Sequence, residues 1–194
     1  MKPKTILILL IGIIACLCMA TQCEKEEPTL PPETQTGANT FGCYVNDELF
    51  VPARHVPGHA VITSGLRAGY NPETKQFGIE CQARNDSFRD MFFLVDNPQE
   101  NECLSFSFLE ITPSQGYKKT CCVSDDCGSI FFTRFDTINN IASGRFEFSG
   151  QCSRYPPYES TRKIQIASGR FDVRFNDNCR PEFIGGQRWV ILCD

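Results

Sequence analysis

Histidines and cysteines are the residue types in this chain that could support metal or nucleophilic chemistry. The two histidines are His55 and His59, and on a helix this spacing would place both rings on one face, as in zinc peptidases. Pro57 and Gly58 lie between them and disfavour a helix, and no glutamate follows His55. A loop could bring both imidazoles to a metal, but a solvated loop is favoured. We therefore assign no metal site and no cofactor.

Thiols and acids occur together in the segment 121–127 (CCVSDDC). Cysteines at this spacing could bind zinc, but no second cysteine pair lies at the usual distance. Asp125-Asp126 also lacks the alternating oxygen ligands of a calcium loop. A disulfide from Cys127, across its own turn or to a neighbouring strand, is favoured over a metal.

Catalysis by a nucleophile or by paired carboxylates finds little support. The chain has no Gly-x-Ser-x-Gly elbow, and a cysteine–histidine pair would need a thiol that stays reduced. Glu80, Asp90, Glu110 and Asp136 could supply the two acids of a glycosidase, but nothing distinguishes one pair. We assign no catalytic residue and favour a non-enzyme, with an envelope hydrolase as the alternative.

Aromatic side chains are the better lead to a binding function. Tyr155-Pro156-Pro157-Tyr158 predicts a rigid loop whose two rings could stack on sugars or dock a partner. In the alternative, Tyr155 and Tyr158 fold back over the end of the core. The sequence thus predicts a non-catalytic module that binds a glycan, a small ligand or a partner protein at the cell envelope, or else a purely structural envelope protein.

The segment 1–22 has the composition of a secretory signal peptide. Lys2 and Lys4 precede an apolar stretch that ends at Ala20 among small residues. The apolar part begins at Ile6 and is shorter than the roughly 20 residues of a membrane-spanning helix. Export with cleavage of this segment is therefore predicted.

Cysteines near the end of this segment indicate a lipid anchor, because a bacterial lipoprotein is acylated on the cysteine that becomes its amino terminus. Cys23 is favoured because a polar segment follows it, although Gln22 departs from the small residue that the lipoprotein peptidase prefers. Cys16 follows Ala15 and is the alternative, but it would leave an apolar stub with a spare thiol at Cys18. We expect an outer-membrane lipoprotein on the periplasmic or cell-surface side, with simple secretion as the remaining possibility.

Residues 23–39 combine this cysteine with acids, prolines and threonines, and they predict a disordered tether before a domain at 40–194. The formal charge of the chain is −4, and it becomes −6 when Lys2 and Lys4 are removed. An acidic protein without a Lys/Arg cluster argues against a nucleic-acid partner.

Nine further cysteines follow Cys23, and in an oxidising compartment most are expected to form disulfides. The odd number leaves at least one outside an internal bridge, and the spacing does not reveal the pairing. The candidates are Cys43, Cys81, Cys103, Cys121, Cys122, Cys127, Cys152, Cys179 and Cys193.

Apolar residues of the domain recur with a period of two. Asn46-Asp47 and residues 71–75 predict the turns of two hairpins. Residues 91–95 predict a strand buried on both faces, and residues 103–111 predict one alternating strand. No segment has convincing helical periodicity. The predicted fold is all-β, a single antiparallel β-sandwich or barrel of roughly ten strands that contains disulfides.

One pattern occurs twice, at 141–148 (IASGRFEF) and 166–173 (IASGRFDV). In both copies the apolar parity shifts by one at the glycine, as at a β-bulge, so two adjacent strands with the same kink are predicted. The charged residues expected on their solvated face are Arg145, Glu147, Arg170, Asp172 and Arg174.

The segments 30–46 (LPPETQTGANTFGCYVN), 143–148 (SGRFEF) and 169–173 (GRFDV) resemble a domain-of-unknown-function family of Gram-negative envelope lipoproteins. The resemblance covers the tether and most of the domain. It implies a signal peptide, a lipidated cysteine just before the tether and a β-rich domain, and it supplies no catalytic residues.

Overall fold

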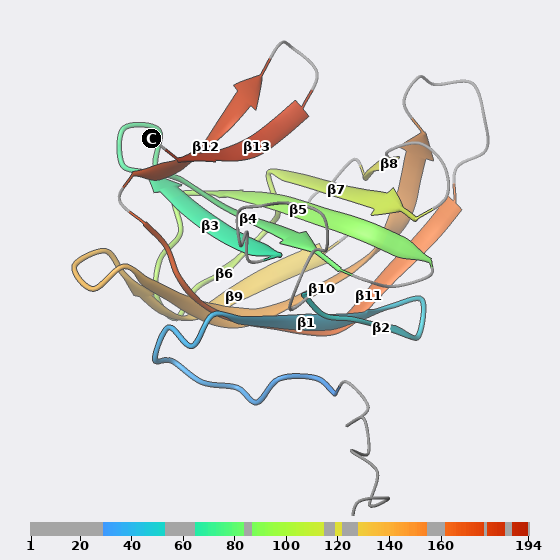
Figure 1. Ribbon diagram of the computed structural model, residues 1–194, viewed down its shortest axis with the longest axis horizontal. Helices are drawn as coiled ribbons and strands as arrows, with labels where there is room; N and C mark the ends of the chain where they lie inside the picture. Colours follow the sequence, from blue (N-terminus) through green and yellow to red (C-terminus); the bar gives the residue numbers. More distant parts are fainter. Residues whose placement is uncertain are drawn as a thin grey trace, which may run out of the picture.

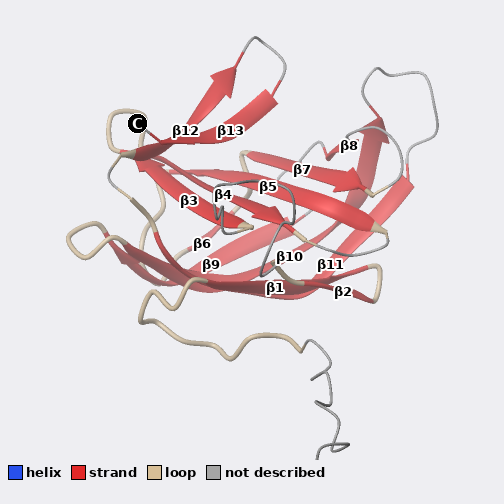
Figure 2. Cartoon of the chain, viewed as in Figure 1, coloured by secondary structure: helices blue, strands red, loops and turns tan. Residues whose placement is uncertain are grey.

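The computed structural model shows an all-β protein. It describes residues 29–52, 65–83, 87–114, 119–121, 128–154, 162–176, 178–184 and 188–193. These residues form thirteen strands and no helix (Figure 2). The predicted antiparallel all-β fold with a disulfide is confirmed, with thirteen strands in place of roughly ten.

Eleven strands belong to one continuous sheet and two form a separate pair (Figure 1). The strands are β1 (Thr40–Val45), β2 (Glu48–Phe50), β3 (Leu66–Asn71), β4 (Gln76–Gln82), β5 (Phe88–Asp96), β6 (Cys103–Leu104), β7 (Phe108–Pro113), β8 (Lys119–Cys121), β9 (Gly128–Asp136), β10 (Ile141–Arg154), β11 (Arg162–Arg174), β12 (Cys179–Ile184) and β13 (Arg188–Cys193). The sheet order is β2-β1-β11-β10-β8-β7-β5-β4-β3, and β9 pairs with both β10 and β6.

The sheet folds over on itself because β10 takes part in two layers. The first part of β10 pairs with β9, whereas its end pairs with β8. The first layer contains β6, β9, β10, β11, β1 and β2, and the second contains β8, β7, β5, β4 and β3 (Figure 1). An isolated bridge between Pro52 and Ala83 joins the chain beyond β2 to the chain beyond β4.

The two copies of the repeated pattern differ, because only the copy in β11 carries the bulge that the sequence predicts for both. They lie on the adjacent antiparallel strands β10 and β11. The pairing of β10 with β9 shifts between Ser143 and Gly144, but the extra residue lies on β9, and Ala142 and Phe146 of β10 face the same core, so the parity shift predicted for this copy is wrong. In β11, Ala167 and Ser168 together face Glu147, and Ser168 has a positive φ of 53°. Bulges increase local twist, which suits strands that curve from one layer toward the other.

Both predicted hairpins are confirmed. The β1–β2 turn uses Asn46 and Asp47, whose φ angles of 49° and 68° suit a two-residue type I′ turn. In the β3–β4 hairpin, the side-chain oxygen of Asn71 accepts hydrogen bonds from the amides of Glu73 (3.0 Å) and Thr74 (3.3 Å). Local turn chemistry therefore fixes these two registers.

The prediction of one strand over residues 103–111 is wrong. Cys103–Leu104 pair with β9 in the first layer as β6, whereas Phe108–Pro113 pair with β5 in the second layer as β7. Phe106 lies between these strands and is buried in the core. The apolar alternation of the sequence continues across the crossing because Phe108 also packs against apolar residues, although in the second cluster and not in the main core, so the pattern alone does not reveal the crossing.

β5 is buried on both faces, as its apolar run predicts. Its inward residues belong to the main core, and Phe92 and Leu94 point outward into a second cluster with Ile191 and Cys179. The β12–β13 pair thus covers the outer face of the second layer. Gly69 of β3 permits the close approach, because an added Cβ would lie 2.6 Å from the Cys179 carbonyl oxygen.

Phenylalanine rings fill the space between the two layers. Phe146 of β10 has ring-centroid distances of 5.2 Å to Phe41 of β1 and 5.5 Å to Phe93 of β5. Phe77 of β4 meets Phe132 of β9 at 5.7 Å. Because these contacts connect strands of both layers, burial and ring geometry together hold the layers face to face.

Phe146→Ala is expected to lower the free energy of unfolding by about 3–5 kcal/mol, because it leaves a cavity where a fully buried ring packs. Phe131→Ala is the matched control, since Phe131 is 37% exposed, and its cost should be about 1 kcal/mol or less. Denaturant unfolding measures both values. Equal costs would show that the ring cluster does not hold the layers together.

Candidate functional site

Residues 29–39 lie along the outer face of the first layer, and we call this segment the strap (Figure 1). The sequence predicts a disordered tether over 23–39, but the strap is bonded to β9, β10 and β11. Pro31 covers Gly42 of β1, where an added Cβ would lie 2.6 Å from the Pro31 ring. The folded unit therefore includes residues before position 40.

The carboxylate of Asp172 in β11 is the centre of the strap's contacts. Its side chain is 1% exposed and accepts hydrogen bonds from the backbone amides of Thr36 (3.1 Å), Gly37 (2.8 Å) and Ala38 (3.1 Å). The hydroxyl group of Thr34 also donates to it at 2.5 Å. Successive amides that converge in this way form an anion-binding concavity, and here the protein supplies the anion itself.

The sequence predicts that Asp172 lies on a solvated face. This prediction is wrong, because Asp172 is buried beneath the strap. The hydroxyl group of Ser143 in β10 donates to it at 2.7 Å. Burial raises the pKa of Asp172, but hydrogen bonds from Thr34, Ser143 and the amides of Ala38 and Gly37 outweigh burial and lower the pKa from 3.8 to about 2. The group is therefore ionised at neutral pH.

Arginines of the first layer hold the rest of the strap. Arg145 and Arg170 are register partners in β10 and β11, and both pair with Glu33, at 2.5 Å and 3.5 Å. The Glu33 carboxylate offsets the repulsion between two like charges that face each other across the strands. Arg170 also donates to the Pro31 carbonyl at 3.2 Å.

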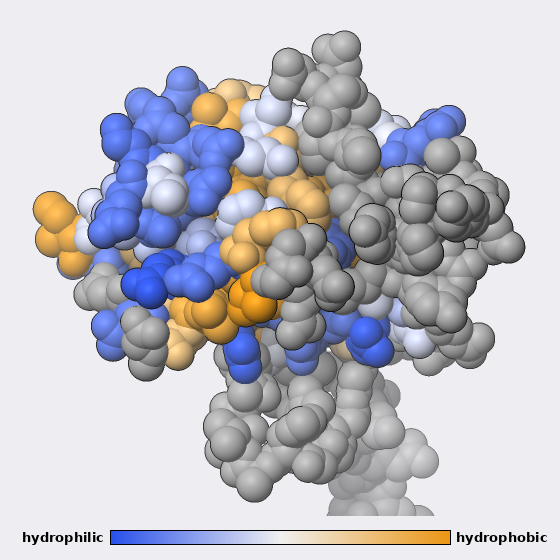
Figure 3. Space-filling view, turned by 90° about the horizontal axis from the view of Figure 1, so that it is seen from above, coloured by the Kyte–Doolittle hydropathy of each residue, from blue (hydrophilic) through white to orange (hydrophobic). Residues whose placement is uncertain are grey.

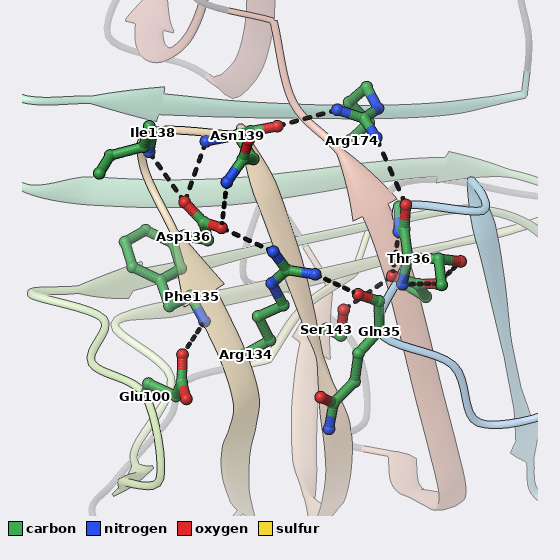
Figure 4. A network of polar contacts seen from close by, with 12 residues as sticks. Gln35, Thr36, Glu100, Arg134, Phe135, Asp136, Ile138, Asn139, Ser143 and Arg174 are labelled. Carbon is green, nitrogen blue, oxygen red and sulfur yellow. Dashed lines mark hydrogen bonds and ion pairs between the residues drawn. The ribbon is translucent and has the colours of Figure 1, made fainter.

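Arg134 and Arg174 bind the next part of the strap (Figure 4). Arg134 donates to the Gln35 carbonyl at 2.6 Å, and Arg174 donates to the Thr36 carbonyl at 3.4 Å. Guanidinium groups therefore satisfy strap carbonyls that have no partner strand.

Asp136 closes the turn between β9 and β10 and fixes the position of Arg134. Its carboxylate accepts hydrogen bonds from the amides of Ile138 (3.0 Å) and Asn139 (2.9 Å), from the Asn139 side chain (2.7 Å) and from Arg134 (2.7 Å). Hydrogen bonds from Asn139, with the one from Arg134, hold the pKa of Asp136 well below its usual range. The turn is thus built to present Arg134 to the strap.

β12 and β13 form a two-stranded unit that we call the ribbon. At its base, Cys179 and Cys193 are register partners joined by a disulfide. At its free end, Phe183 and Trp189 are register partners with ring centroids 5.4 Å apart. Because an isolated two-stranded unit is marginally stable, the disulfide and the packing on the second layer hold it in place.

The ribbon carries three exposed apolar side chains, two of them at its free end and Leu192 near its base. Phe183 is 53% exposed, Ile184 39% and Leu192 38%. They are three of the six large apolar residues that are exposed in the described ranges. On the ribbon side of the molecule, apolar atoms gather in a band between hydrophilic regions (Figure 3). A concentration of this kind is typical of an interaction surface.

A pocket of about 390 Å³ lies beside the base of the ribbon. Arg67 of β3 and Arg174 of β11 line it together with the ribbon's disulfide, and its described lining contains no acid. Arg174 already donates to two carbonyl groups, those of Asn139 and Thr36. The volume suits a small ligand, but the geometry singles out no ligand chemistry.

The candidate disulfide cysteines have different outcomes. Cys179 and Cys193 form the bridge described above. Cys43, Cys81 and Cys103 are free thiols, so these three candidates form no disulfide in the structure. Cys43 and Cys81 are fully buried and act as small apolar residues of the core, and burial raises the pKa of both thiols.

Most other predicted site residues lie outside the described part of the chain. Cys121 and Cys152 are register partners of β8 and β10. The predicted site residues that lie outside the described ranges are Cys16, Cys23, His55, His59, Cys122, Cys127, Tyr155 and Tyr158. Within the described ranges, no group of three or more His, Cys, Asp or Glu side chains is placed to hold a metal ion. The same ranges contain no helix long and apolar enough to cross a bilayer.

The strap and the ribbon are the two features that sequence reasoning missed. The strap has the composition of a linker, and its partners on β9 to β11 are about a hundred residues or more away in sequence. The ribbon had a readable signal, since Cys179 and Cys193 flank Gly185-Gly186 symmetrically with apolar residues between, as in a disulfide-closed hairpin.

Comparison with known proteins finds no family model, no curated protein and no solved structure that matches this chain.

Asp172→Asn is expected to lower the free energy of unfolding by about 2–3 kcal/mol, because it weakens charge-assisted hydrogen bonds to a buried group. Glu147→Gln is the matched control, since it also removes one carboxylate charge, from an exposed side chain on the adjacent strand β10. Denaturant unfolding compares the two. If the costs were the same, Asp172 would not hold the strap.

Acid should remove the stabilisation that Asp172 supplies. Because its pKa is lowered in the folded state, this stabilisation is complete above about pH 4 and is lost as the pH falls toward 2. The difference in unfolding free energy between wild type and Asp172→Asn, measured from about pH 6 downward, should therefore shrink with acid. A constant difference would contradict the lowered pKa.

Thiol labelling should separate the three cysteines that are free within the described ranges. Cys103 is exposed and should react with a maleimide in the native protein. Cys43 and Cys81 should react only after unfolding, because burial excludes the reagent and raises their pKa values. Peptide mass spectrometry gives the readout. Native labelling of Cys81 at the rate of Cys103, or a disulfide at Cys43, would contradict the structure.

Proposed function

We propose that this chain is an exported outer-membrane lipoprotein, anchored through Cys23, whose β-domain binds a partner protein without catalysis. The observation that carries the binding proposal is the exposed apolar surface of the ribbon, with Phe183 and Ile184 at its free end and Leu192 near its base. Exposed apolar surface is unfavourable in water by about 25 cal/mol per Å², and a partner that covers the ribbon would recover this free energy.

The composition of the ribbon favours a protein over a glycan or a small ligand. Sites for polar ligands combine rings with convergent hydrogen-bonding groups, but the neighbours of Phe183 include the aliphatic Ile184. The charged pair Arg180–Glu182 is satisfied internally at 2.6 Å. Among the described residues, β12 and β13 pair only with each other. An extended segment of a partner could therefore add along an edge of the ribbon.

Export and lipidation are supported by the signal-like segment 1–22, by Cys23 and by the resemblance to envelope lipoproteins. The Cys179–Cys193 disulfide is consistent with an oxidising compartment. Cys16 is the alternative lipidation site. The strap begins after Cys23, so acylation there would leave the folded unit intact.

Metabolic labelling with an alkyne fatty acid tests the anchor in a Gram-negative host. Wild type and Cys16→Ala should be labelled, whereas Cys23→Ala should lose the label and accumulate as precursor. Mass spectrometry of the mature amino terminus should find acylated Cys23. The reverse pattern would place the anchor at Cys16, and no label on wild type would overturn the lipoprotein proposal.

A photo-crosslinking amino acid at position 183 of the full-length lipoprotein tests the ribbon in intact cells. A discrete adduct of defined mass is expected there. The matched control is position 138, because Ile138 is apolar and 91% exposed but lies in the β9–β10 turn. The same adducts at both positions, or none at position 183, would contradict a specific partner on the ribbon.

A further inference from the structure

We infer that the strap fixes the orientation of the domain on the membrane, with the strap face toward the lipid and the ribbon directed away from it. The inference rests on the proposed lipid anchor at Cys23. In this orientation the strap face lies next to the lipid surface. The ribbon faces the aqueous side, from which a partner protein approaches it.

The strap and the ribbon lie on opposite faces of the folded sheet. The strap packs on the outer face of the first layer, through Glu33 to Arg145 and Arg170. The ribbon packs on the outer face of the second layer, through Gly69 and Gly78 (Figure 1). Layers stack at about 10 Å intervals, so the strap, two sheet layers and the ribbon place its free end roughly 30 Å from the strap.

The chain between the anchor and the strap is short. Seven residue steps separate Cys23 from Leu30, and at about 3.5 Å per step they span at most roughly 25 Å. A disordered tether running to residue 39 would instead reach roughly 50 Å and would let the domain turn freely. Because the strap is fixed to three strands, the free chain is limited to these seven steps, and the strap face is held closer to the lipid than the ribbon is.

Energy transfer from tryptophan to a dansyl-labelled lipid tests the orientation. Trp189 is the single tryptophan, so the native protein reports the distance of the ribbon from the bilayer. The matched donor is the variant Tyr44→Trp with Trp189→Phe, because Tyr44 is 36% exposed on β1, two residues from the strap-covered Gly42. Acylated, full-length protein in phospholipid vesicles is used for both.

Transfer from position 44 should be severalfold more efficient than transfer from Trp189. A flexible Gly-Ser insertion between Pro28 and Thr29 lengthens the anchor segment without changing the strap, and it should bring the two efficiencies closer together. Near-ultraviolet circular dichroism confirms that each variant keeps its tertiary packing.

Equal transfer from the two donors, or stronger transfer from Trp189, in protein shown to be acylated at Cys23 would overturn the inference and leave the lipoprotein proposal standing. An amino terminus without acyl chains would overturn the lipoprotein proposal itself. Mass spectrometry of the same sample distinguishes these two failures.

Discussion

Burial of the Asp172 carboxylate beneath the strap is the interaction on which the arrangement of the molecule depends. A charge taken out of water costs several kcal/mol unless it is fully hydrogen-bonded. Here three amides of the strap and the hydroxyl groups of Thr34 and Ser143 supply the donors. Detaching the strap would remove most of these donors at once. The strap is therefore part of the fold, although its composition is that of a linker.

The two faces of the folded sheet are specialised in different ways. One outer face is polar, and its arginines bind the carboxylate and carbonyl groups of the strap. The other outer face is apolar, with Phe92 and Leu94 of β5 covered by the ribbon. Between them the phenylalanine core joins the layers. In the proposed lipoprotein, the polar face carries the strap that leads to the lipid anchor. The opposite face carries the ribbon, which is available for a partner.

The fold could be predicted from the sequence wherever the information is local. Asn46-Asp47 indicates its turn, residues 91–95 indicate a doubly buried strand, and the glycine parity shift indicates the bulge of β11, although not one in β10. The layer crossing at residues 105–107 could not be predicted, because alternation continues through it. The strap could not be predicted either, since its stabilising partners are distant in sequence and its residues are polar.

Hydrogen exchange at the amides of Thr36, Gly37 and Ala38 tests most directly whether the strap belongs to the fold. These three amides donate to Asp172, so their protection from exchange should be close to that of the first-layer strands. In the Asp172→Asn variant, the three amides should exchange at the rate of an unstructured peptide. Exchange at the rate of an unstructured peptide in the wild-type protein would contradict the account.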